Sequence, residues 1–120
     1  MLGYKVFAAG LNDTAVAALV LDVGTAISAA GTTQGTATAL TNALNGISTA
    51  SAGSGVVLYA GSAGDCQLVY NAGANAVNVY PPSGARINGI AANAPHLLAT
   101  STACEYWFLS ATQIVGVLSA

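Results

Sequence analysis

Histidine-based chemistry has a single candidate in this chain, His96. Its neighbours Pro95 and Leu97 supply neither a nucleophile nor an acid that would orient the imidazole, as a catalytic histidine requires. One histidine and two distant cysteines also lack the paired ligand spacing of zinc sites. We therefore expect no catalytic residue and no metal site, and we interpret His96 as a turn or strand-edge residue.

Carboxylate chemistry has four candidates, which are scattered along the chain: Asp13, Asp22, Asp65 and Glu105. Glycosidase chemistry needs two acids that converge on one bond. Asp65 and Glu105 each flank a cysteine on a predicted strand, so they could meet in space, or they could be solvated strand-end acids. The sequence therefore predicts no enzyme, no cofactor and no small-molecule substrate.

The two cysteines, Cys66 and Cys104, leave three interpretations open. They could be buried free thiols that act as small hydrophobic residues. They could form a disulfide within the chain, or they could bridge two chains. A bridge within the chain would stabilise it by roughly 3–4 kcal/mol if unstrained.

Charged residues are scarce, at 5% of 120 residues against a norm of about 25%. The length suits one domain, and the net charge of −2, with two basic residues, argues against nucleic-acid binding. Asp22 and Gly24 interrupt the most apolar stretch, so no membrane span is expected. An uncharged surface loses its water at low cost, which favours contacts with other chains; the alternative is a neutral, sticky monomer.

From Gly24 onward the chain shows short runs rich in Val, Thr, Tyr and Ile, separated by turn residues. The pattern predicts an all-β fold, an antiparallel β-sandwich or jelly-roll-like barrel of about eight short strands. Residues 36–44 could instead form a helix. Residues 71–75 are predicted to be a hairpin loop in which Gly73 is able to take positive φ, Gly84 ends a turn, and Asn88-Gly89 is a tight turn. The expected strands lie at residues 26–30, 36–40, 46–50, 56–59, 66–70, 76–80, 95–98, 103–109 and 113–118.

Residues 1–24 differ from the rest and are predicted to be an N-terminal arm or docking segment before a β-sandwich domain at residues 25–120. The segment could be a short helix, a strand or an extended arm. Its apolar character indicates that it docks on its own domain or on a neighbour. Adjacent Tyr106 and Trp107 must point to opposite faces of a strand, so one fills the core and the other reaches an interface. The candidate interface residues are Tyr4, Phe7, Leu11, Tyr80, Tyr106 and Trp107.

Three stretches of the sequence carry a resemblance to a known family. They are NAGANAVNVYPPSGARINGIAANAP at residues 71–95, SATQ at residues 110–113 and TTQGTATAL at residues 32–40. In order and spacing they resemble small structural proteins of tailed bacteriophages, over residues 26–118. The resemblance implies a β-sandwich virion component, a head decoration (cement) protein or a fibre module, often trimeric. Ile114 departs from the family's usual aromatic after SATQ, and Cys66 and Cys104 stand where ordinary strand residues are expected.

Composition and resemblance together predict a phage virion protein that stabilises the head by packing on major capsid subunits. Its expected partners are the major capsid protein and copies of itself in a homotrimer, with assembly in the bacterial cytoplasm. The alternative is a head- or tail-fibre module that binds a host receptor or glycan. The chain is short and lacks a long fibrous repeat, which argues against that alternative.

Overall fold

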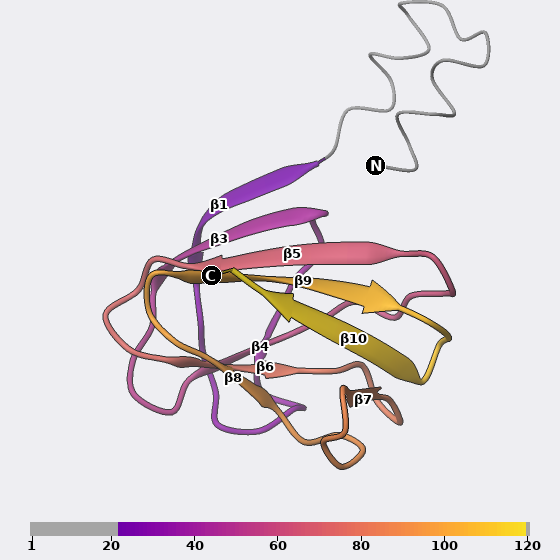
Figure 1. Ribbon diagram of the computed structural model, residues 1–120. Coiled ribbons are helices and arrows are strands. Elements are labelled where there is room, and N and C mark those ends of the chain that lie inside the picture. The colour runs from indigo at the N-terminus through magenta and orange to yellow at the C-terminus, as the bar shows by residue number, and fades with distance from the viewer. Residues whose placement is uncertain (1–21, 120) are drawn as a thin grey trace, which may run out of the picture.

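A computed structural model describes residues 22–119, which form ten β-strands and no helix (Figure 1). The strands are β1 (Val23–Ser28), β2 (Thr38–Ala39), β3 (Leu44–Thr49), β4 (Gly55–Val57), β5 (Cys66–Asn71), β6 (Val77–Tyr80), β7 (Arg86–Ile87), β8 (His96–Leu98), β9 (Thr102–Phe108) and β10 (Gln113–Leu118). A six-stranded sheet has the order β1-β3-β5-β9-β10-β7, and a four-stranded sheet has the order β2-β4-β6-β8. The prediction of an all-β chain is confirmed for these residues.

The first six strands stack as solenoid-like turns. The chain alternates between the two sheets, so β1 and β2, β3 and β4, and β5 and β6 each make one turn, and successive turns pair in parallel. Parallel pairing places similar side chains level with one another, as with Ile27 and Ile47 or Val56 and Val79. Leu44 pairs 21 residues after Val23, and Leu68 pairs 24 residues after Leu44, which is why the sequence shows no repeat of fixed period.

Antiparallel strands close the stack at its C-terminal end. β9 pairs antiparallel with β5, β10 with β9, and β8 with β6, while the short β7 joins β10 in parallel. The prediction of an antiparallel sandwich or jelly-roll-like barrel of about eight strands is therefore corrected: both sheets are mixed, and the chain winds between them. The sequence showed the alternation within each strand. It did not show whether a neighbouring strand runs parallel or antiparallel, because long-range contacts decide the pairing.

One local prediction needs correction as well. Residues 71–75 are not a hairpin loop, since β5 and β6 lie in different sheets and the loop is a corner between them. Gly73 is not among the residues with positive φ, and its lack of a side chain serves close packing, because a Cβ there would lie 2.7 Å from Ala50 Cβ. The strand predicted within residues 36–40 is confirmed as β2, and the alternative of a helix at residues 36–44 is not what the structure shows.

Two predicted turns are confirmed. Gly84 has a φ of 86° in a turn closed by the Ala85 amide donating to the Pro82 carbonyl at 3.0 Å. Asn88 has a φ of 53°, and the Ile90 amide donates to the Ile87 carbonyl at 3.0 Å across Asn88-Gly89. Asn and Gly tolerate these conformations better than other residues do, which is why the sequence signal was specific.

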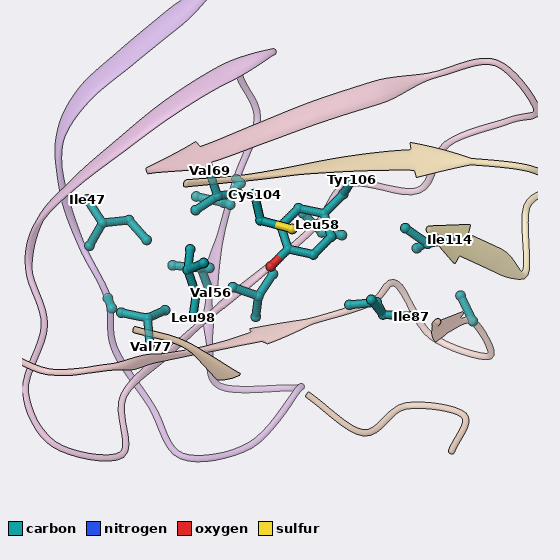
Figure 2. Packing of buried hydrophobic residues seen from close by; sticks show 14 of the residues in the cluster. Ile47, Val56, Leu58, Val69, Val77, Ile87, Leu98, Cys104, Tyr106 and Ile114 are labelled. Carbon is teal, nitrogen blue, oxygen red and sulfur yellow. The ribbon is translucent and has the colours of Figure 1, made fainter. Parts of the chain in front are cut away.

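The core lies between the two sheets and is filled by inward-pointing side chains (Figure 2). β5 and β9 show strict alternation of buried and more exposed positions over most of their length. Tyr106 and Phe108 are the largest fully buried side chains of the described residues. Each strand thus supplies one face to the core, and its other face is free to meet solvent or a partner.

Residues 1–21 lie outside the described residues, and with them the candidate interface residues Tyr4, Phe7 and Leu11. Val23 and Gly24, which the sequence placed in the arm, belong to β1, so the strand begins before the expected boundary at residue 25. Within residues 22–119 there is no helix long and apolar enough to cross a membrane.

Candidate functional site

Fully buried side-chain amides hold the corners of the fold together, and nothing in the sequence marked them as buried. Gln67 is 0% exposed, and its Nε2 donates to the carbonyls of Leu40 (3.2 Å) and Asn42 (2.9 Å), while its Oε1 accepts from the Tyr59 amide (3.2 Å). Asn71 likewise donates to the carbonyls of Asn75 and Leu98 and accepts from Gly73. Both amides have their bonding capacity used by backbone, so they serve the fold rather than a ligand.

The residues that carry the phage-like resemblance serve the same purpose. Gln34 Nε2 donates to the Pro81 carbonyl at 2.7 Å, and Asn93 Oδ1 accepts from the Gly84 amide at 2.7 Å. Gln113 Nε2 donates to the Asn88 backbone carbonyl, and the Asn88 side-chain Oδ1 accepts from the Gly116 amide. The Asn, Gln and Gly positions of the motif are therefore links between loops, and the motif describes a fold more than a binding site.

His96 has one notable partner. Its Nδ1 and the Tyr106 hydroxyl are hydrogen-bonded at 2.8 Å, which joins β8 of the four-stranded sheet to β9 of the six-stranded sheet. Burial lowers the pKa of His96 and raises that of Tyr106. The pair ties the two sheets together through neutral groups, and the interpretation of His96 as a strand-edge residue agrees with its place at the start of β8.

The carboxylates Asp65 and Glu105 do not converge. Asp65 closes a turn by accepting the Ser62 amide at 2.8 Å, and its carbonyl accepts the Phe108 amide. Asp65 is thus level with Phe108, and Glu105 lies three residues before Phe108 in β9, which is about 10 Å at 3.3 Å per residue. Within residues 22–119, no three His, Cys, Asp or Glu side chains gather into a group that could hold a metal ion.

Both cysteines are free thiols in the structure. Cys66 pairs with Trp107 and Cys104 pairs with Val69, so they are three positions apart on neighbouring strands and face opposite sides of the sheet. That offset, about 10 Å along the strands, is too long for a disulfide within the chain. Burial, followed by the charge of Glu105, raises the pKa of the Cys66 thiol to about 11.

Three of the candidate interface aromatics lie in the described residues. Tyr106 is 0% exposed and Tyr80 is 7% exposed, with the Tyr80 hydroxyl donating to the Thr32 carbonyl. Trp107 points to the opposite face from Tyr106, is half-buried, and donates from Nε1 to the Glu105 carboxylate at 3.3 Å. Of these three, Trp107 is the one with surface to offer a partner.

The outer face of the six-stranded sheet is apolar, and we call it the apolar face. Strand register aligns Val23, Leu44, Leu68, Glu105 and Val117 in one row across five strands. Val23 and Val117 are 57% and 52% exposed. Glu105, the fourth residue of the five, is the charged member of the row, and Arg86 lies on the edge strand β7. The residues that define the apolar face are Leu44, Leu68, Tyr70, Trp107, Val115 and Val117.

A hollow of about 290 Å³ opens beside this row. Leu68, Ala103, Cys104, Glu105, Val117, Leu118 and Ser119 line it. A cavity of about 150 Å³ lined by apolar side chains accepts a benzene ring, so the hollow is large enough for one aromatic side chain. The apolar face therefore combines a broad surface with a hollow, and it is the best candidate for a functional site in the described part of the chain.

Comparisons of the chain with protein-family models, with curated proteins and with solved structures find no match. The resemblance to phage structural proteins stays a prediction. The function has to be argued from the residues and their arrangement.

Proposed function

We propose that the chain is a structural subunit of a tailed-bacteriophage virion, a capsid decoration protein that stabilises the head by packing on major capsid subunits. The observation that carries the proposal is the apolar face, a broad sheet surface with one central charge, Glu105. Centres of protein interfaces are depleted in charge and enriched in Tyr and Trp, and this face presents Tyr70 and Trp107. The sequence resemblance supports the same class of protein.

The sheet edges favour attachment through a face rather than by strand addition. β2 and β7 have two residues and β8 has three, so these edges offer few backbone groups to a partner strand. β1 is longer, but its register shifts around Ala26, which has a φ of 56°, and such a bulge interrupts an edge. A partner is therefore met by side chains on a flat surface.

The mechanism is burial of apolar area. Each Å² of apolar surface removed from water contributes about 25 cal/mol, and a head that carries many copies multiplies the effect. Charges contribute little, because the chain has so few of them. Attachment should then depend weakly on ionic strength.

The proposal is tested by co-sedimentation of the purified chain with phage heads that lack it. Val117→Asp places a second carboxylate on the apolar face, directly opposite Glu105, and should abolish binding, because two unpaired carboxylates would be buried together. Leu97→Asp is the matched control, since Leu97 is 64% exposed on β8 of the other sheet and the change in charge is the same. Wild-type binding should persist in 1 M salt.

Equal loss of binding in both variants, or loss of wild-type binding in 1 M salt, would contradict attachment through the apolar face. Binding to host cells with no binding to heads would favour the fibre module instead. Size-exclusion chromatography with light scattering tests the homotrimer that is expected among the partners of this chain.

A further inference from the structure

We infer that residues 1–21 of the same chain cover the apolar face in the free protein. The inference concerns the isolated chain and goes beyond the proposed function. Large exposed apolar patches are uncommon on soluble proteins that lack a partner, and a chain with 5% charged residues has little else to keep such patches apart. Three features of the chain identify the segment that fits.

The first feature is where the segment enters. Residue 21 is followed by Asp22, whose carbonyl accepts the Leu44 amide at 3.0 Å, and by Val23, which is itself part of the row across the apolar face. The segment is therefore tethered at the rim of the surface it would cover. A short tether gives an effective concentration in the millimolar range, which favours docking on the same chain over docking on a second copy.

The second feature is reach. Glu105 lies three strand spacings from Val23, or about 14 Å across the sheet. Lys5 precedes Val23 by 18 residues, and even the compact rise of a helix, 1.5 Å per residue, would span about 27 Å over that length. The segment is therefore long enough for Lys5 to reach Glu105.

The third feature is complementarity. Most residues of the segment are apolar, as the face is, and Lys5 is its one basic residue against Glu105 at the centre of the face. The hollow beside Glu105 and Val117 is large enough for the ring of Tyr4 or Phe7. Two copies packed face to face about a two-fold axis would instead bring two Glu105 carboxylates together away from water, which is unfavourable.

The chain's single tryptophan, Trp107, lies on the apolar face and reports whether that face is covered. In the full chain we expect acrylamide to quench Trp107 weakly. Phe7→Asp combined with Leu11→Asp should raise the quenching constant and shift the emission to longer wavelength. The matched control is Leu97→Asp on the other sheet, which should leave Trp107 unchanged. Near-UV circular dichroism of the buried tyrosines verifies that each variant is folded.

A second measurement identifies the occupant. Cys66 lies on the outer face next to Trp107, so Phe7→Cys should form a disulfide with Cys66 under mild oxidation and remain a monomer on a non-reducing gel. Equal quenching in wild type and in the arm variant would overturn the inference. A disulfide-linked dimer would also overturn it, by assigning the face to a second copy.

This inference and the proposed function can fail separately. Arm and capsid would compete for one face, so Phe7→Asp with Leu11→Asp should strengthen binding to heads if both are right. If Trp107 shows no cover while Val117→Asp abolishes head binding, the inference fails and the proposed function stands. If Trp107 is covered and the chain does not bind heads, the inference stands and the proposed function fails.

Discussion

Replacement of the buried amide of Gln67 should destabilise the fold more than its size suggests. Gln67 lies in β5 and bonds to three backbone groups: the Leu40 and Asn42 carbonyls at the corner before β3, and the Tyr59 amide after β4. One side chain thus links three successive segments of the winding chain. Gln67→Leu keeps a similar volume and removes all three bonds, so the effect reports on polar satisfaction rather than on a cavity.

The loss of stability depends on how far water can hydrate each backbone group that loses its hydrogen bond. The bond to Leu40 is buried, and a buried acceptor left without a partner costs about 1–3 kcal/mol. The bonds to Asn42 and Tyr59 are partly buried and contribute about 0.5–1.5 kcal/mol each. The sum is about 2–6 kcal/mol, a large share of the 5–15 kcal/mol that stabilises a typical domain.

The assay is equilibrium unfolding in urea, followed by circular dichroism and by Trp107 fluorescence to verify a single transition. Gln113→Leu is the matched control, because Gln113 also donates to two backbone carbonyls but is partly exposed, so its loss should cost less than about 1 kcal/mol. Equal stability losses for the two variants would refute the argument that burial sets the cost. So would a Gln67→Leu protein as stable as wild type.

Three further predictions follow from the core and its edges. Burial lowers the pKa of His96 below 6.5, so His96 takes up a proton at a higher pH in the unfolded chain than in the folded one. The free energy of unfolding should therefore decrease below about pH 6.5 and be unaffected above it. His96→Gln should remove the change in stability measured between pH 5 and 7. Gly55→Ala should destabilise by about 1–3 kcal/mol, because its Cβ would lie 2.8 Å from the Tyr80 ring and 2.9 Å from the Asn78 carbonyl oxygen, whereas Gly35→Ala, with open space, should be close to neutral in the same unfolding assay. At pH 8 iodoacetamide should modify Cys66 slowly, because the pKa of its thiol is about 11, and Cys104 more slowly still, because it is 1% exposed. Mass spectrometry should find both thiols modified only after denaturation, and a reductant should leave the gel mobility of the native chain unchanged.

Local structure was largely legible in the sequence. Alternation at residues 66–70, 76–80, 103–109 and 113–118 located β5, β6, β9 and β10 to within a residue or two, because a strand half-buried in a sheet must alternate. The turns at Gly84 and Asn88 were legible because few residues adopt positive φ. The hairpin predicted at residues 71–75 was wrong because a corner and a hairpin use the same turn residues, and only the partner strand distinguishes them.

The sequence predicted the candidate site only in part. The sequence predicted that Tyr106 and Trp107 face opposite ways, but the alternation alone did not say that Tyr106 is the buried one. Gln67 carries no signal of its burial, since its three partners come from corners up to 27 residues away. The geometry that separates Cys66 from Cys104 also needed the pairing of β5 with β9.

The sequence by itself determined that this chain is rich in strands, poor in charge and without a legible catalytic or metal motif. Those properties depend on residue types and on spacings of two to four residues. The tertiary structure decided that the turns stack in parallel and that Val23, Leu44, Leu68, Glu105 and Val117 form one row on one face. Residues separated by 12 to 37 positions become neighbours only when strand order and register are set, and those are set by packing of the whole core.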